Sequence, residues 1–225
     1  MKNLWPLEDA IDTLPIAGKS LRNWVQEGVL SQSDLDAVIY PWSFLDFHEG
    51  LLKKVEENNL ACSDCTTAQL DEGASLMVGE GTRVLPGVYV EGQVVVGKNC
   101  KIGPNCYLRG PISIGDHCHV GQGVELKNTI LGDGTNVGHL SYIGDSVLAN
   151  KVNLGAGTIT SNLRHDGKNH RSVIEGEVID TGRRKFGTVI GNGVHTGIHT
   201  SLYPGRKLGP GTTTLPGEVV CKDKQ

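Results

Sequence analysis

The sequence predicts an all-β fold whose larger part is a parallel β-helix, and two observations lead to this class. Aliphatic residues recur at every sixth position along much of the 225-residue chain, and most of them are followed by glycine. The composition is rich in turn residues, with 31 glycines against three phenylalanines. In a β-helix of hexapeptide repeats each short strand buries one aliphatic side chain, and each tight corner favours a residue without a Cβ atom.

Residues 1–72 lack this period and predict a small, partly helical N-terminal segment. The stretch "SQSDLDAVI" contains a serine suited to cap a helix, followed by acidic residues. In "YPWSFLDFHEGLLKKVEENN" Pro41 stands where a first helical turn tolerates proline, and apolar residues follow at helical spacings. We therefore expect helices in this segment and the β-helix in residues 73–225.

The hexad series defines the expected core of the β-helix. Its positions are Val78, Val84, Val90, Val96, Ile102, Leu108, Ile114, Val120, Leu126, Leu131, Val137, Ile143 and Leu154, then Ile190, Thr196, Leu202, Leu208, Thr214 and Val220. A column four residues later is also expected to face inward: Val88, Val94, Cys100, Cys106, Ile112, Cys118 and Val124. Free cysteines in such a column act as small hydrophobes. The two cysteines of "CSDC" at 62–65 have the spacing of one half of a zinc site, but no second half lies nearby, so we predict no metal.

Two interruptions of the repeat carry basic residues in an otherwise acidic chain. Residues 161–187 break the hexads, look loop-like and contain six Arg or Lys against four Asp or Glu, so they form a candidate anion site. Arg109 and Lys127 occupy a slot usually held by glycine, eighteen residues apart and hence on adjacent coils. Two stacked cations without an acid between them would repel, which a bound phosphate would relieve. From position alone, a phosphate site and a pair of solvated surface charges are equally favoured interpretations.

The overall charge argues against broad classes of partner. A net charge of −4 does not suit a general nucleic-acid or membrane-surface protein. No apolar run approaches the roughly 18 residues of a membrane span, and the N-terminus turns acidic before a signal-peptide core could form. We expect a cytoplasmic protein with small-molecule ligands.

Three motifs in order resemble one family. "GHLSYIGD", "VNLGAGTITSN" and "GRRKFGTVIG" are similar to the acetyltransferase domain of the glucosamine-1-phosphate acetyltransferase/N-acetylglucosamine-1-phosphate uridyltransferase family, most of all to its archaeal-type sugar-1-phosphate branch. The likeness covers roughly residues 76–220. It implies a left-handed β-helix, a homotrimer with active sites between subunits, and acetyl-CoA as the co-substrate. The implied acceptor is a hexosamine 1-phosphate, with glucosamine and galactosamine left open.

The resemblance assigns the acceptor side of the site. His139 matches the general base, and an imidazole, with an ordinary pKa of about 6.5, suits removal of a proton from an amino sugar. Tyr142 matches the hydroxyl that helps to place the sugar phosphate, and Asn153 matches a sugar contact. Arg109 and Lys127 match the phosphate-binding cations, which favours the functional interpretation of that pair.

The coenzyme side follows in the same way. Ala156 matches a coenzyme contact, and Asn162 matches a contact to the coenzyme and to the tetrahedral intermediate, whose oxyanion its amide would stabilise. Leu163 and Ile198 stand where other members carry Tyr and Ser, so coenzyme binding is expected to differ in detail. Two lysines compete for the role of the active loop lysine: Lys168 and Lys185.

The N-terminal segment departs from the family. "LPIAGKSL" and "YPWSFLD" resemble remnants of the nucleotidyltransferase domain and its linker, but the glycine-rich nucleotide signature is absent. We therefore predict no uridyltransferase activity and consider a separate nucleotidyltransferase as a partner. Two alternatives are a non-catalytic sugar-phosphate-binding remnant and a γ-type carbonic anhydrase, which would need a zinc site of three histidines.

Overall fold

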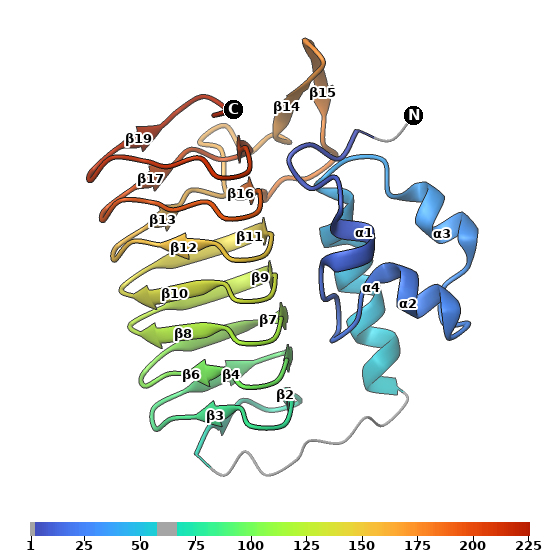
Figure 1. The fold of residues 1–225 in the computed structure, drawn as a ribbon, viewed down its shortest axis with the longest axis vertical. Helices are drawn as coiled ribbons and strands as arrows, with labels where there is room; N and C mark the ends of the chain where they lie inside the picture. Colours follow the sequence, from blue (N-terminus) through green and yellow to red (C-terminus); the bar gives the residue numbers. More distant parts are fainter. Residues whose placement is uncertain (1–2, 58–66) are drawn as a thin grey trace.

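The computed structural model describes residues 3–57 and 67–225 and confirms the predicted fold class, a parallel β-helix with a partly helical N-terminal segment. Its coils stack along one axis, and the helices lie together on one side of the stack (Figure 1). The "CSDC" pair at 62–65 lies outside the described residues.

Strands of successive coils pair in parallel and form three faces. The first face is built from β1 (Gln69–Leu70), β4 (Tyr89–Glu91), β7 (Tyr107–Ile114), β9 (Glu125–Leu131), β11 (Tyr142–Leu148), β13 (Ile159–Thr160), β17 (Ser201–Leu202) and β19 (Val219–Val220). The second contains β3 (Arg83–Val84), β6 (Lys101–Ile102), β8 (His119–Gln122), β10 (Asn136–His139) and β12 (Asn153–Leu154). The third contains β2 (Ser75–Val78), β5 (Gln93–Val96), the later parts of β7, β9 and β11, then β16 (Thr188–Ile190) and β18 (Arg206–Leu208).

The hexad residues form the core inside these faces, as predicted. Leu108 pairs in register with Leu126, which in turn pairs with Ile143, and all three are fully buried. The column of small residues is buried as well, and burial raises the pKa of Cys106 to about 12, so that its thiol stays protonated. Cys106 therefore acts as the small hydrophobe that the repeat predicted, and Cys100 and Cys118 are buried in the same column.

Four helices make up the N-terminal segment: α1 (Ala10–Thr13), α2 (Leu21–Gln26), α3 (Gln32–Ala37) and α4 (Ser43–Glu57). Ser31 caps α3 in a capping box with Asp34, because each side chain accepts a hydrogen bond from the other's backbone N–H. The helices in "SQSDLDAVI" and "YPWSFLDFHEGLLKKVEENN" are thus where the sequence placed them.

The helical segment packs on the outside of the third face and buries it. Val95, Ile130 and Val147 point outward from β5, β9 and β11 and are buried in one cluster with the apolar side chains of the helices. Trp42 meets Phe186 edge to face at a centroid distance of 6.0 Å. Because this face is covered, ligands and partners have access to the other two.

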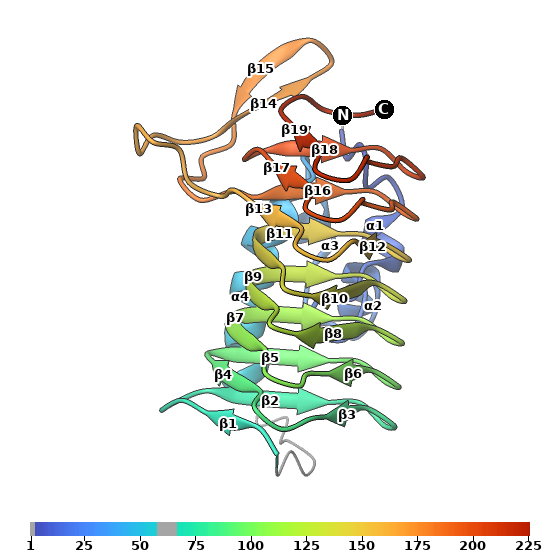
Figure 2. The same ribbon diagram turned by 90° about the vertical axis from the view of Figure 1, so that its left-hand side faces the viewer.

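Residues 161–187 are not the simple loop that the sequence suggested. They contain an antiparallel hairpin of β14 (Arg171–Ile174) and β15 (Glu177–Asp180), which stands out beyond the last coils (Figure 2). Glu175 and Gly176 both have positive φ, the backbone that a two-residue hairpin turn requires. The base of the hairpin is fixed by the buried Lys207, whose Nζ donates to Ser172 Oγ at 2.8 Å and to the Val173 carbonyl at 2.7 Å.

Candidate functional site

His139 and Tyr142 flank one corner of the β-helix. His139 ends β10 on the second face, Tyr142 begins β11 on the first, and Leu140 turns the chain between them with φ of 49°. The carbonyl of His139 accepts hydrogen bonds from the N–H of Gly157 at 3.1 Å and from Ser141 Oγ at 2.8 Å. The backbone of His139 is therefore fixed, while the residue itself is exposed to solvent.

Tyr142 contacts Asn162, which follows the neighbouring strand β13. Asn162 Nδ2 donates to the Tyr142 hydroxyl at 2.9 Å and to Asp145 Oδ2 at 2.5 Å. Burial, and then the charge of Asp145, raises the pKa of Tyr142, so the phenol stays protonated at neutral pH. A Cβ on Gly144 would collide with the Tyr142 hydroxyl and with Asn162 Nδ2, so a larger residue at this position would displace one of the two side chains.

Arg109 and Lys127 are stacked as predicted. They pair in register on β7 and β9, and Gly144 of β11 follows Lys127. The expectation that no acid compensates them is wrong. Arg109 donates to Glu125 at 2.8 Å and lies 3.7 Å from Glu91.

Lys127 is compensated in the same way, since its Nζ donates to the two oxygens of Asp145 at 2.9 and 3.1 Å. The acids lie on strands next to those of the cations. The prediction rested only on the position that follows each inward aliphatic residue, and Glu125 and Asp145 occupy other positions. The Nε atom of Arg109 is buried and makes no hydrogen bond within the described part of the chain. It faces Glu91 at 3.7 Å, which is an ion pair and too long for a hydrogen bond.

The remaining predicted residues surround this centre without joining it. Asn153 is exposed on β12, and the carbonyl of Ala156 accepts a hydrogen bond from the His199 N–H. Leu163 and Ile198 are exposed, as are Lys168 and Lys185 in the insertion. Within residues 3–57 and 67–225, no hydrogen bond or ion pair connects the side chains of either lysine to Tyr142 or Lys127.

Four polar residues next to the site escaped the sequence analysis. Asp145 is 2% exposed and is surrounded by Lys127, Asn162 and Asn128. Asn128 also donates to Glu49 of α4 at 2.8 Å, and Arg183 of the insertion donates to Glu49 at 2.6 Å. Asp145 is the last residue of the "GHLSYIGD" motif, but its neighbours in the sequence are those of an ordinary aspartate at a corner of the repeat, so nothing local marked it as part of the site.

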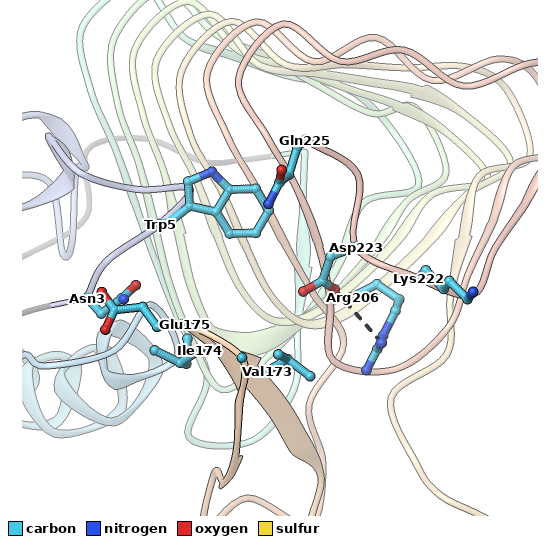
Figure 3. Close-up of a pocket in the computed structure, with 10 residues that line it drawn as sticks. Asn3, Trp5, Val173, Ile174, Glu175, Arg206, Lys222, Asp223 and Gln225 are labelled. Carbon is cyan, nitrogen blue, oxygen red and sulfur yellow. Dashed lines mark ion pairs between the residues drawn. The ribbon is translucent and has the colours of Figure 1, made fainter.

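A pocket of about 500 Å³ adjoins the start of the insertion. Leu163, Arg164, His165 and Tyr203 are among its lining residues. A second pocket of about 500 Å³ lies at the end of the coil stack, where Trp5, Glu175 and Arg206 line it (Figure 3). None of the predicted site residues lines this second pocket, so it does not belong to the site described above.

Residues 3–57 and 67–225 contain no group of three His, Cys, Asp or Glu side chains arranged to hold a metal ion. Within the same ranges, none of the helices has the length and apolar character needed to cross a membrane.

Comparison with known proteins defines the class. The model of the GMPPB C-terminal domain family matches residues 90–203, which is half of the chain, and the chain belongs to this family. The bifunctional sugar-1-phosphate nucleotidylyltransferase/acetyltransferase of Sulfurisphaera tokodaii is 46% identical over 100 residues, covering 44% of this chain and 25% of that protein. The bifunctional protein GlmU of Methanococcus aeolicus is 36% identical over 169 residues, covering 75% of this chain and 40% of that protein.

These relatives confirm the resemblance to the sugar-1-phosphate acetyltransferase family. The chain spans only about a quarter to two fifths of their length. A structure of GDP-perosamine N-acetyl transferase from Caulobacter crescentus aligns with 16% identity over 88% of this chain and 70% of that one. Its TM-score of 0.28 supports no conclusion about this chain.

Proposed function

We propose that this chain transfers the acetyl group of acetyl-CoA to the amino group of a hexosamine 1-phosphate. The observation that carries the proposal is a polar group on the first face, in which Lys127, Tyr142 and Asn162 are connected through Asp145 and Arg109 pairs in register with Lys127, while His139 precedes Tyr142 at the adjoining corner. They come from adjacent coils, and their types suit an amine acceptor with a phosphate group. The acetyltransferase relatives support the same chemistry.

His139 is proposed as the general base. An amino sugar is mostly an ammonium ion at neutral pH, and it attacks a thioester only after it loses a proton. The exposed position of His139 at the corner allows an acceptor to approach it. Direct transfer then forms the amide bond and releases coenzyme A as the free thiol.

Asn162 and Tyr142 are proposed to contact the reacting groups. Both N–H groups of Asn162 are engaged, one with Tyr142 and one with Asp145. Asn162 would therefore have to release Tyr142 to donate to the oxyanion of the intermediate. The Tyr142 hydroxyl would then be free to contact the acceptor.

Arg109 and Lys127 are proposed to hold the phosphate. Their register on adjacent strands supports this role, because one phosphate group would accept hydrogen bonds from both cations. Glu125 and Asp145 already balance part of the positive charge. Asn153 would contact the sugar, as the family resemblance implies.

The coenzyme is proposed to lie along the corner above His139, in the pocket beside Leu163, with Ala156 and Ile198 as contacts. Exposed apolar side chains gather around this corner and suit a second copy of the chain: Leu140, Ile159, Leu163, Ile198, Tyr203, Leu215 and Val219. We propose a homotrimer in which Lys168 or Lys185 reaches a neighbouring site. A separate nucleotidyltransferase would consume the acetylated product.

The test is thiol release from acetyl-CoA with a panel of hexosamine 1-phosphates, run with and without UTP. We expect release with at least one acceptor and no UDP-sugar formed by this chain alone. No release with any acceptor, together with measurable binding of a sugar phosphate, would favour the non-catalytic alternative.

A further inference from the structure

We infer that Asp145 is a positioning residue, which holds Asn162 and Lys127 in place for the reaction and is itself held from α4 through Asn128 and Glu49. The inference rests on the proposed function for its catalytic consequence. Its structural part, the control of the insertion by Asp145, is independent of that function.

Asp145 is a buried carboxylate whose acceptor capacity is used in full. Its two oxygens accept four hydrogen bonds from three side chains, those of Lys127, Asn128 and Asn162. The 2.5 Å contact with Asn162 is the shortest of the four. A buried carboxylate is stable only when its charge and its lone pairs are matched in this way.

Asp145 also holds both ends of the insertion. Its side chain contacts Asn162 at the start, and its carbonyl accepts the N–H of Gly187 at the end, at 2.8 Å. The Phe186 N–H donates to the Asn162 carbonyl at 2.9 Å and closes the two ends on each other. The position of Asn162 therefore depends on Asp145 as well as on its own backbone.

The helical segment supports Asp145 from the other side. Asn128 Nδ2 joins Asp145 to Glu49 of α4, at 3.1 and 2.8 Å. Arg183 of the insertion donates to Glu49 and to Asp46, so α4 compensates a second cation close to the site. A continuous series of hydrogen bonds thus runs from α4 to Tyr142.

The chain contains a matched control for this assignment. Lys207 and Asp223 form another lysine–aspartate pair in the same coil stack, with the same Nζ–O distance of 2.9 Å as Lys127 and Asp145. The Lys207 pair contacts none of Arg109, Lys127, His139, Tyr142 and Asn162, although Lys207 also donates to Ser172 and Val173 in the hairpin of the insertion. A loss of general stability should follow from breaking either pair, whereas a loss of positioning should follow only from breaking the pair at Asp145.

The experiment compares Asp145→Asn with Asp223→Asn by thiol-release kinetics and by hydrogen exchange. We expect Asp145→Asn to lower kcat by about a hundredfold, the effect of displacing a catalytic group by about 1 Å, and to raise the acceptor KM. Exchange at Phe186 and Gly187 should become faster. Asp223→Asn should leave kcat, both KM values and these two amides unchanged.

A second variant guards against a failure of Asp145→Asn to fold. Glu49→Gln alters a partly exposed residue and should change kcat and exchange in the same direction by a smaller factor. Wild-type kcat and wild-type exchange in both Asp145→Asn and Glu49→Gln would overturn the inference. If the wild type releases no thiol with any acceptor, the proposed function fails, and the exchange comparison alone decides whether Asp145 positions Asn162.

Discussion

His48 makes the stability of the protein depend on pH. Its imidazole lies on α4, is completely buried, and neither ring nitrogen has a hydrogen-bond partner within the described residues. Burial, and then the positive charge of Arg183, lowers the pKa of His48 to about 3. The folded protein therefore holds His48 neutral under conditions in which the unfolded chain would bind a proton.

The sign and size of the effect follow from this difference. Below an ordinary pKa of about 6.5 the unfolded chain takes up the proton, so stability falls as the pH decreases from about 6.5 toward about 3. The slope approaches about 1.4 kcal/mol per pH unit, and between about pH 7.5 and about pH 5 the free energy of unfolding should fall by about 2 kcal/mol from His48 alone. Burial also lowers the pKa of His170 and of His119, so the total loss should be larger.

The comparison of wild type with His48→Leu isolates the contribution of His48. At about pH 7.5 the variant should be as stable as the wild type or more so, because it removes two buried nitrogens that have no partner. Urea denaturation can be followed by tryptophan fluorescence, since all three tryptophans, Trp5, Trp24 and Trp42, lie in the N-terminal segment. An equal loss of stability in both proteins between about pH 7.5 and about pH 5 would refute the assignment.

Three further predictions concern the proposed site. His139→Ala should lower kcat by about 10²- to 10⁴-fold without unfolding the coils, and wild-type turnover would contradict the general-base role. Arg109→Ala or Lys127→Ala should chiefly raise the acceptor KM, and equal use of an amino sugar with and without its phosphate by the wild type would exclude a phosphate site. Residues 161–187 should close as a lid over the bound ligands, so hydrogen exchange in this segment should slow when coenzyme A and a hexosamine 1-phosphate are bound. Unchanged exchange at saturating ligand would show that the insertion is not a lid.

The inside of the β-helix could be predicted because each hexad position reports directly on burial. Val90, Leu108 and Leu126 are all completely buried, as the six-residue step requires. α4 was predictable for a similar reason, since its apolar residues recur at helical spacing. In both cases the periodicity is local and needs no knowledge of a distant partner.

The sequence also contains a pattern that predicts where the helical segment packs, in addition to the hexad repeat. A strand that is buried on both sides is apolar at consecutive positions. Val94–Val96, Ile130–Leu131 and Val147–Leu148 are runs of this kind, and their outward residues contact the helices. The six-residue repeat accounts only for the inward-facing aliphatic residues. The apolar residue next to each of them does not belong to the repeat, and it is this residue that predicts a covered outer face.

The role of Asp145 depends on residues that are distant in the sequence. The tripeptide Ile-Gly-Asp occurs twice and ends once at Asp116 and once at Asp145. In both copies the isoleucine is a buried hexad residue. Asp116 accepts the Lys98 N–H of the preceding coil at 2.7 Å, as an ordinary corner residue does. Asp145 has the same local sequence, yet it accepts from Asn162, which lies within the insertion, and it is buried where Asn128 connects it to α4. What distinguishes the two aspartates is the pair of non-repeating segments, the insertion and the helices, that converge on only one of them.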